Sequence, residues 1–175
     1  MKQVHHGRII IISIFILTIL AKMFFIDISK IKGHSMEPNL HKNQVIFINS
    51  MAYGLQWPII KEYIVHWAQP RPGDVVVVRD PRENKELVKR CVGVAGDLWT
   101  IEEGYLKVRG CSYPLIQYSY LLLEERRRVP VNHILVVGDN YEDSIDSRTF
   151  GYIEWNDILG RVMGSYIDPC TRLTH

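Results

Sequence analysis

A serine at position 35 lies in the stretch IKGHSMEPNL, residues 31–40, and is a candidate nucleophile. A serine hydroxyl attacks poorly until a nearby base takes its proton. Histidine is disfavoured as that base, because His34 is the chain neighbour of Ser35, adjacent side chains usually point apart, and no G-x-S-x-G elbow surrounds the serine. The other route is a lysine whose pKa is lowered by burial among apolar side chains. The alternative interpretation is that Ser35 is only a turn residue.

Lys89 is the lysine that fits this requirement, since it lies inside the apolar stretch ELVKRCVGVAGD. Alternation along a strand puts Lys89 and Cys91 on one face and Val88 and Arg90 on the other. If the strand is half buried, one of the two adjacent cations must face inward or line a cleft. The alternative is that both are edge-strand charges that discourage aggregation.

The stretch GDNYEDSIDSRTFG, residues 138–151, is the third candidate region. Its Gly-Asp-Asn start is typical of a turn. Asp146 and Arg148 are two residues apart, so in an extended segment they share a side and could form an ion pair. The hydroxyl of Ser144 could orient a nearby amine by a hydrogen bond. The alternative is a polar surface loop.

An apolar run at residues 9–26, IIIISIFILTILAKMFFI, precedes these candidates, and fifteen of its eighteen residues are apolar. As a helix it would be roughly 27 Å long, close to the hydrocarbon thickness of a bilayer. A cleaved signal peptide is disfavoured by the poor cleavage site around Ala21, and a buried core helix by the near absence of a polar face. The run therefore predicts a single transmembrane anchor after a short cytoplasmic N-terminus, residues 1–8. Basic residues flank both sides, so charge alone does not orient it.

The rest of the chain, residues 27–175, has no second apolar run of that length and is rich in short Val and Ile stretches between turn residues. This pattern predicts a mainly β domain, an antiparallel sheet or barrel. The expected strands lie at 44–49, 74–80, 86–97, 98–110 and 133–140. The apolar and aromatic segment 51–69 is expected to be a loop or short helix, either against the bilayer surface or over the core.

Composition excludes some functions. The formal net charge of +2 argues against a nucleic-acid-binding protein, which would need a strongly basic face. The chain has three cysteines, and neither they nor the histidines have the spacing of a metal site, so no metal is expected. One disulfide is possible and at least one thiol is left over, but the sequence does not assign the pair.

The order of these pieces resembles that of type I signal peptidases, the membrane-anchored serine proteases that remove signal peptides from exported proteins. The blocks that carry the resemblance are the N-terminal anchor, GHSMEPNL, RPGDVVVV, LVKRCVGVAGD and VPVNHILVVGDNYEDSIDSRTFG, which together span nearly the whole chain. The resemblance implies Ser35 as nucleophile and Lys89 as general base. It further implies Ser144 as a hydrogen-bond partner of the lysine amine, and Asp146 and Arg148 as an ion pair that supports the site.

The same resemblance covers three more residues. It implies a structural role for Asp139 in the last block, and Met36 follows the nucleophile as the family expects. Gly33 is a departure, because some members have at this position a serine whose hydroxyl helps to hold the oxyanion. Backbone donors such as the Ser35 N–H would then carry most of that role.

Partners and location also follow from the resemblance. It implies preprotein signal peptides as substrates, no cofactor, a bilayer-bound monomer with its catalytic domain on the extracytoplasmic side, and no nucleic acid. Three alternatives remain: a mitochondrial inner-membrane peptidase subunit, a self-cleaving serine–lysine repressor, and an inactive membrane-anchored β module of an export complex. The repressor is disfavoured, since a membrane segment and not a helix-turn-helix precedes Ser35.

Overall fold

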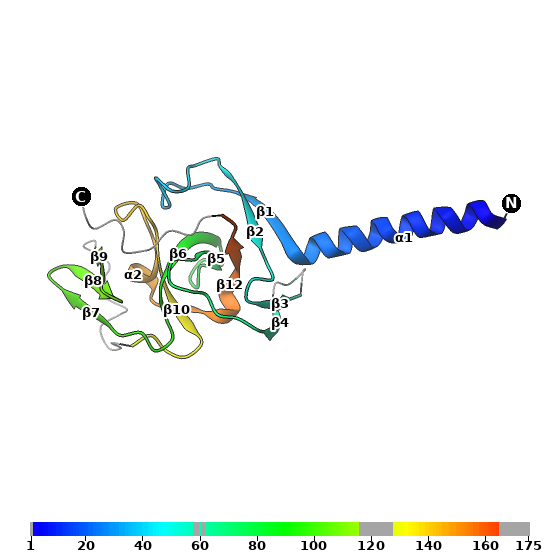
Figure 1. Ribbon diagram of the computed structural model, residues 1–175. Coiled ribbons are helices and arrows are strands. Elements are labelled where there is room, and N and C mark those ends of the chain that lie inside the picture. The colour runs from blue at the N-terminus through cyan, green and yellow to red at the C-terminus, as the bar shows by residue number, and fades with distance from the viewer. Residues whose placement is uncertain (1, 58–59, 61, 116–127, 165–175) are drawn as a thin grey trace.

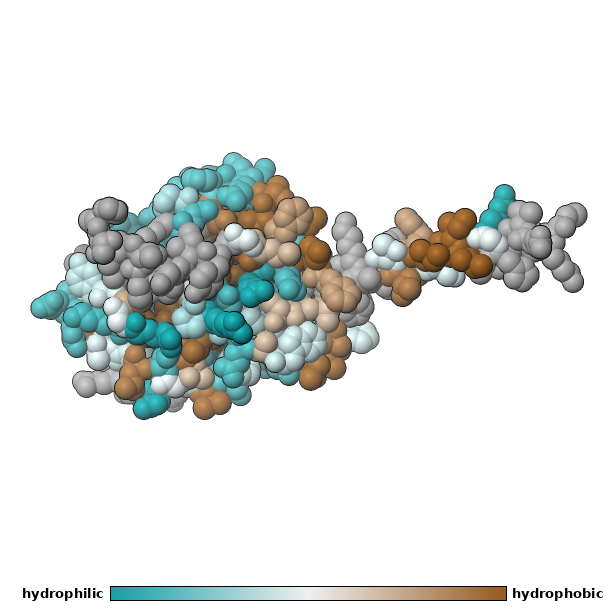
Figure 2. All heavy atoms as spheres, in the orientation of Figure 1, coloured by the Kyte–Doolittle hydropathy of each residue, from teal (hydrophilic) through white to brown (hydrophobic). Residues whose placement is uncertain are grey.

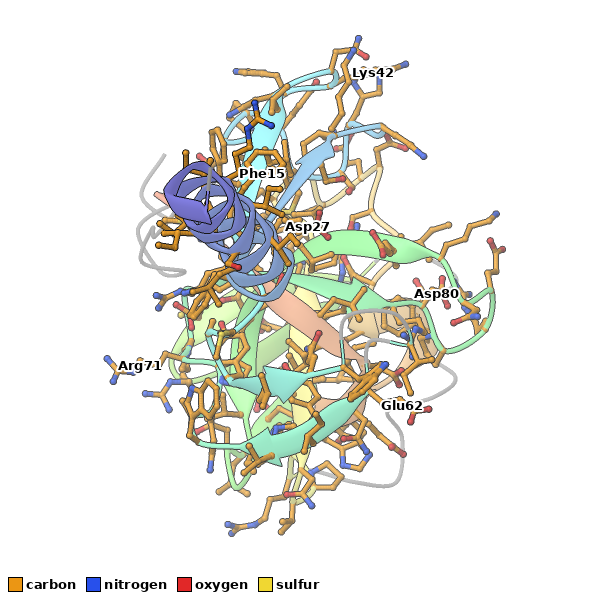
Figure 3. All side chains as sticks on the ribbon, turned by 90° about the vertical axis from the view of Figure 1, so that its right-hand side faces the viewer. Phe15, Asp27, Lys42, Glu62, Arg71 and Asp80 are labelled. Atoms are coloured by element: carbon orange, nitrogen blue, oxygen red, sulfur yellow. The ribbon has the colours of Figure 1, made fainter. Side chains whose placement is uncertain are left out.

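A long helix leads into a β domain in the computed structural model, which describes residues 2–57, 60, 62–115 and 128–164. The helix α1 (Lys2–Phe25) projects from the domain in Figure 1, and Figure 3 looks along it onto the face from which it emerges. The apolar run predicted to be helical lies in α1 except for Ile26, which begins the first strand. Within the described part of the chain, no helix has both the length and the hydropathy needed to cross a membrane.

One antiparallel sheet of seven strands forms the body of the domain. In sheet order its strands are β1 (Ile26–Lys30), β2 (Val45–Asn49), β12 (Ile158–Val162), β5 (Val75–Arg79), β6 (Glu86–Val94), β10 (His133–Val137) and β11 (Ile153–Glu154). The mainly β, antiparallel fold expected from the sequence is confirmed. The sheet is open, with β1 and β11 at its two edges.

The valine run of β5 shows why the core lies on both faces of the sheet. Val75 and Val77 belong to one buried hydrophobic cluster, and Val76 and Val78 to another. Because side chains alternate along a strand, a continuous run of valines fits a central strand that is covered on both sides. This burial fixes β6, whose residues 86–90 pair with the whole of β5.

Two segments considered in the sequence, residues 98–110 and 51–69, contain hairpins. Residues 98–110, expected as one run, divide into β7 (Trp99–Glu102) and β8 (Tyr105–Val108), and β9 (Cys111–Pro114) completes a three-stranded sheet. The two turn residues between β7 and β8, Glu103 and Gly104, both have positive φ, at 54° and 81°, as a tight hairpin turn requires.

The prediction of a loop or short helix at 51–69 is wrong, since this segment contains the hairpin of β3 (Gly54–Gln56) and β4 (Tyr63–His66). Side chains from both strands donate hydrogen bonds to the backbone oxygen of Ile158, and these contacts tie the hairpin to the main sheet. Trp57 and Trp67 remain about half exposed. Such long-range contacts are not encoded in local periodicity, which explains the error.

Hydrophobic side chains are also exposed along α1 and on the part of the domain beside it (Figure 2). On β1 and β2 these include Ile28 and Phe47, which lie directly opposite each other on the outer face of the sheet.

The described cysteines differ in bonding state. Cys91 is free and fully buried, whereas Cys111 is disulfide-bonded. Cys170 lies outside the described residues.

Candidate active site

Ser35 and Lys89 meet at the centre of the candidate site. Ser35 lies in the loop between β1 and β2 and is partly exposed. Lys89 lies in β6, only 2% of its surface is exposed, and its Nζ is 2.8 Å from the Ser35 Oγ. A solvent-accessible hydroxyl is thus in hydrogen-bond contact with a buried amine, the arrangement that lysine-based activation of a serine requires.

The surroundings of Lys89 favour its neutral form. Burial lowers the pKa of its amine from the ordinary value of 10.5 to about 8, with Asp146 acting against the fall and the positive charge of Arg148 adding to it. The Nζ also donates a hydrogen bond to the Ser144 Oγ over 3.0 Å. Two hydroxyls therefore hold the amine, and near pH 8 about half of the molecules carry it uncharged.

Both adjacent cations of β6 are buried, not only one of them. Arg90 is 4% exposed, and its guanidinium forms two hydrogen bonds of 2.8 and 2.7 Å with the Asp139 carboxylate. It also donates to the backbone oxygen of Gly73. Because β6 lies between β5 and β10, the interpretation of Lys89 and Arg90 as edge-strand charges is wrong.

Asp139 takes its structural role through this contact. Its carboxylate accepts hydrogen bonds from Arg90 and from the amide of Asn39, which follows Ser35 in the same loop. Asp139 thus joins β6, the loop that holds Ser35 and the segment after β10. Sequence reasoning missed Arg90 and Asn39 as partners of Asp139. The only signal for Arg90 was its charge inside an apolar strand, because a buried arginine needs a buried partner.

Asp146 is the central acceptor of the hydrogen-bond network next to Lys89. Its Oδ2 accepts hydrogen bonds from the Ser144 hydroxyl at 2.6 Å, the backbone N–H of Gly138 at 2.9 Å and Arg148 at 2.8 Å. Its Oδ1 accepts a further bond from the Arg148 Nε at 2.9 Å. Since Ser144 donates its proton to Asp146, its oxygen is left to accept from the Lys89 amine.

The ion pair of Asp146 and Arg148 forms in a different backbone conformation from the one expected. Asp146 caps the short helix α2 (Ser147–Phe150), and its side chain accepts the backbone N–H of Arg148. Asp146 itself is extended, whereas Arg148 lies in the helix, because a capping aspartate gains bonds to the first helical N–H groups. Arg148, 1% exposed, also donates to the backbone oxygens of Pro114 and Tyr141 and so crosslinks three segments.

Gly138 and Asn140 contact the backbone of Ser35 from the segment after β10, and sequence reasoning read both only as turn residues. The backbone N–H of Asn140 donates to the backbone oxygen of Ser35 at 2.9 Å. A Cβ on Gly138 would overlap the Ser144 Oγ and lie 2.6 Å from that same Ser35 oxygen. Only glycine permits this close approach of the two segments.

The two neighbours of Ser35 in the loop differ in burial. Met36 is 1% exposed and packs in a core cluster with Ile31 and Leu40, so it anchors the loop beneath the serine. Gly33 is exposed, and a Cβ there would meet no atom closer than the Ser35 nitrogen at 4.0 Å. The position has room for a larger side chain.

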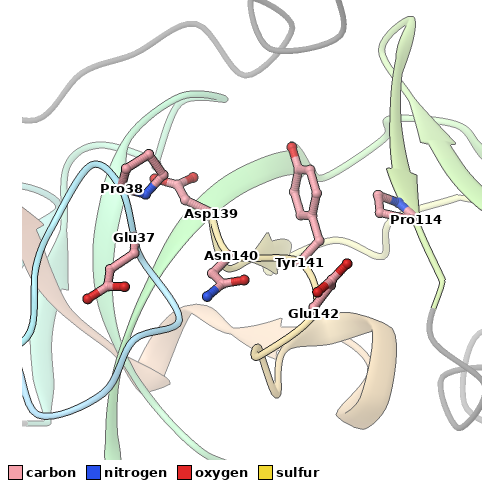
Figure 4. A pocket seen from close by; sticks show the side chains of 7 residues that line it. All are labelled: Glu37, Pro38, Pro114, Asp139, Asn140, Tyr141 and Glu142. Atoms are coloured by element: carbon pink, nitrogen blue, oxygen red, sulfur yellow. The ribbon is translucent and has the colours of Figure 1, made fainter. Parts of the chain in front are cut away.

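A cavity of about 510 Å³ adjoins the loop that holds Ser35 (Figure 4). Glu37 and Pro38 border it on one side and Pro114 on the other, with residues 139–142 between them. The Glu37 carboxylate is paired with the His34 ring at 2.9 Å, and this side-chain hydrogen bond holds the pKa of Glu37 below its usual range. The cavity opens to solvent and can take part of an extended peptide.

Comparison with known proteins identifies the family. Residues 4–167 match the model of the family described as "Signal peptidase, peptidase S26". A signal peptidase I of Pseudomonas aeruginosa is 28% identical over 88% of this chain and 63% of its own length. A signal peptidase I of Bacillus caldolyticus is 29% identical, covering 81% of this chain and 79% of the relative.

Two further matches are more partial. Human mitochondrial inner membrane protease subunit 1 is 29% identical over 74% of this chain and 63% of its own length. The crystal structure of a signal peptidase I from Enterococcus faecalis aligns with a TM-score of 0.44 and 23% identity, over 54% of this chain and 97% of that chain. The family model, which spans almost the whole sequence, is decisive: this chain belongs to the signal peptidase family, peptidase S26.

Proposed function

We propose that this protein is a membrane-bound serine endopeptidase that removes N-terminal signal peptides from exported preproteins, with Ser35 as nucleophile and Lys89 as general base. The observation that carries the proposal is the buried Lys89 amine 2.8 Å from the Ser35 hydroxyl. Ser144, Asp146 and Arg148 support the base. Asp139 holds the Ser35 loop through Asn39 and is itself held by Arg90 of β6. Membership of the peptidase S26 family supports the same reaction.

Acylation begins with the neutral Lys89 amine, which takes the proton of the Ser35 hydroxyl as the oxygen attacks the scissile carbonyl carbon. The tetrahedral intermediate collapses and breaks the C–N bond. The protonated Lys89 gives its proton to the leaving nitrogen, which becomes the amino terminus of the mature protein. The signal peptide remains attached to Ser35 as an ester.

Deacylation uses the same base. Lys89 takes a proton from water, and the oxygen of that water attacks the ester carbonyl carbon. The bond to the Ser35 oxygen breaks, and this oxygen receives the proton from Lys89. The signal peptide leaves as a carboxylic acid, which loses its proton to solvent, and the amine is neutral again. Lys89 thus relays one proton from Ser35 to the leaving nitrogen and a second from water back to Ser35.

The negative charge on the substrate oxygen requires donors close to Ser35. We assign the backbone N–H of Ser35 as this donor, because Gly33 has no side chain that could donate a hydrogen bond. The rigid loop, held by Met36 in the core and by Asn140 at the Ser35 oxygen, keeps this N–H in place.

Substrate binding by strand addition suits the position of β1. This strand is an edge of the main sheet and leads directly into the loop that holds Ser35. An extended peptide beside an edge strand gains main-chain hydrogen bonds, and side-chain pockets then supply specificity. We propose that the substrate has small residues at the last and third-last positions of its signal peptide, as the family resemblance implies.

Anchoring at the membrane is the second part of the proposal. We assign residues 9–26 as a single-pass anchor, residues 1–8 to the cytoplasm and residues 27–175 to the extracytoplasmic side. The support is the exposure of Ile and Leu side chains along α1, such as Ile11 and Leu17, each 68% exposed. Exposed apolar residues on β1 and β2, next to the end of the helix, extend this surface toward the sheet.

The test compares the full-length chain with Ser35→Ala and Lys89→Ala in cleavage of a radiolabelled preprotein in detergent at pH 8. The wild-type chain is expected to release the signal peptide, and both variants to lose nearly all activity. Lys107→Ala, on β8, is the matched control and should cleave normally, because its amine pairs with Glu102 outside the site. Full activity of Ser35→Ala would overturn the mechanism, and an inactive wild-type chain would favour the alternative of a catalytically silent β module.

A mitochondrial role is the second candidate, favoured by the similarity to the human inner membrane protease subunit. It has the same chemistry, so a preprotein with a bacterial export signal and one with a mitochondrial sorting signal should both be assayed. Selective cleavage of the second would support this candidate.

A further inference from the structure

A second cavity, of about 540 Å³, lies away from Ser35 and has a basic lining. We call it the basal pocket. Its lining residues are Asn49, Arg71, Asp74, Val75, Arg161, Val162, Met163 and Gly164. None of them takes part in the proposed chemistry, so the pocket needs a separate explanation.

The charges in the basal pocket do not cancel. Asp74 is buried and supplies the only carboxylate of the lining, and its Oδ2 already accepts bonds from the Tyr53 hydroxyl and the backbone N–H of Arg71. Its Oδ1 lies 3.7 Å from the Arg161 guanidinium. The side chain of Arg71 is exposed and forms no ion pair with any residue that the structure describes. The lining thus carries a net positive charge with one guanidinium still available.

The pocket lies at the base of α1, next to exposed apolar side chains. Asn49 pairs with Ile26, the first residue after the helix, and also with Arg161. The backbone N–H of Met163, which is 52% exposed, donates to the oxygen of Phe47 on the apolar outer face of β2. In Figure 3, which looks along α1, the side chain of Arg71 reaches outward from the side of the domain.

We propose that the basal pocket binds the phosphate group of an anionic phospholipid, with Arg71 and Arg161 as its ligands. The proposal rests on the membrane anchoring proposed above. A guanidinium presents a planar set of donors that matches phosphate oxygens in pairs. If α1 enters the bilayer, its base lies at the level of the headgroups, where basic side chains gain free energy from anionic lipids. The exposed Phe47 and Met163 would face the acyl chains of the same lipid.

The experiment measures lipid binding to the full-length chain by native mass spectrometry from detergent micelles. Phosphatidylglycerol and phosphatidylcholine with identical acyl chains are compared, for the wild-type chain, Arg71→Gln, Arg161→Gln and Lys107→Gln. The wild-type chain is expected to prefer phosphatidylglycerol, and each arginine substitution to weaken that preference roughly fivefold. Lys107→Gln removes a cation on β8, at the end of the domain away from α1 in Figure 1, and should keep the wild-type preference.

Three results would overturn the proposal. One is equal affinity of the wild-type chain for the two lipids, and another is the same loss in Lys107→Gln as in Arg71→Gln. The third is displacement of the lipid by 10-fold molar excess of inorganic phosphate, which would assign the pocket to a free phosphate anion and not to a headgroup. The thermal midpoint of Arg71→Gln identifies any loss caused by misfolding. Preprotein cleavage by the wild-type chain, measured in parallel, tests the peptidase proposal alone.

Discussion

At the scale of single residues, the burial of Lys89 determines how activity depends on pH. Because burial lowers the pKa of the amine to about 8, its neutral, proton-accepting fraction rises from a few per cent to most molecules between about pH 6.5 and 9. We expect kcat/KM for preprotein cleavage to rise through this range and to reach half its maximum near pH 8. A pH–rate profile of the full-length chain measures this. A rate independent of pH between 5 and 9 would argue against Lys89 as the base.

The same burial makes a prediction for stability. Between pH 8 and 10.5 the unfolded chain binds more protons at Lys89 than the folded one, so its contribution to the free energy of unfolding rises with pH. The lowered pKa corresponds to roughly 3 kcal/mol, present at pH 10.5 and lost as the pH falls to 8. Lys89→Met should abolish this rise of stability with pH. The difference in unfolding free energy between variant and wild type should therefore change by roughly 3 kcal/mol between pH 8 and 10.5. Urea titrations at pH 7.5 and 10.5 test it, and parallel pH curves for the two proteins would contradict it.

Gly33 leaves space where a second oxyanion donor would fit. A Cβ at this position is 4.0 Å from the Ser35 nitrogen and meets nothing else within that distance. Gly33→Ser is expected to raise kcat by about tenfold, since a positioned hydroxyl adds one hydrogen bond to the transition state. Gly33→Ala is the matched control and should show no gain. Equal rates for the two variants would mean that the serine hydroxyl does not reach the oxyanion.

At the scale of elements, three segments converge on the site, namely the loop after β1, the interior strand β6 and the turn after β10. At Gly138 the turn and the loop are so close that a Cβ would lie 2.6 Å from the Ser35 backbone oxygen. Gly138→Ala should lower kcat by at least 100-fold, because the added methyl group would displace the Ser35 backbone or the Ser144 hydroxyl. Gly33→Ala, an added methyl group in open space of the same site, should stay close to wild type. Preprotein cleavage measured alongside the thermal midpoint separates displacement of the site from unfolding, and a nearly wild-type rate for Gly138→Ala would show that the segments can separate without harm.

At the scale of the whole molecule, the β3–β4 hairpin lies near the base of α1 (Figure 1), and one exposed tryptophan directly follows each of its strands. Trp57 and Trp67 are each about half exposed, whereas Trp99 is 3% exposed and packs in the core. In vesicles with brominated acyl chains, which quench nearby tryptophans, replacement of Trp57 and Trp67 by Phe should remove most of the quenching. Trp99→Phe should leave it unchanged. Quenching that survives the double substitution would place this hairpin away from the bilayer.

Several features of this protein follow from its sequence alone. Runs such as the four valines of β5 encode burial by their composition, because the hydrophobic effect acts on every strand that is covered on both faces. Ser35, Lys89, Ser144, Asp146 and Arg148 were all singled out from their types and neighbours, and the structure brings them into one hydrogen-bonded network.

Other features were decided only by the tertiary structure. Neither the interior position of β6 nor the pairing of Arg90 with Asp139 is encoded locally, since both depend on which strands become neighbours. The hairpin within residues 51–69 forms because the side chains of Gln56 on β3 and Tyr63 on β4 bind the backbone of β12, about 100 residues away. Local periodicity indicates which secondary structure a segment can form. The packing of the whole chain determines which distant residues become its partners. This packing buries the Lys89 amine, and the burial lowers its pKa as the proposed chemistry requires.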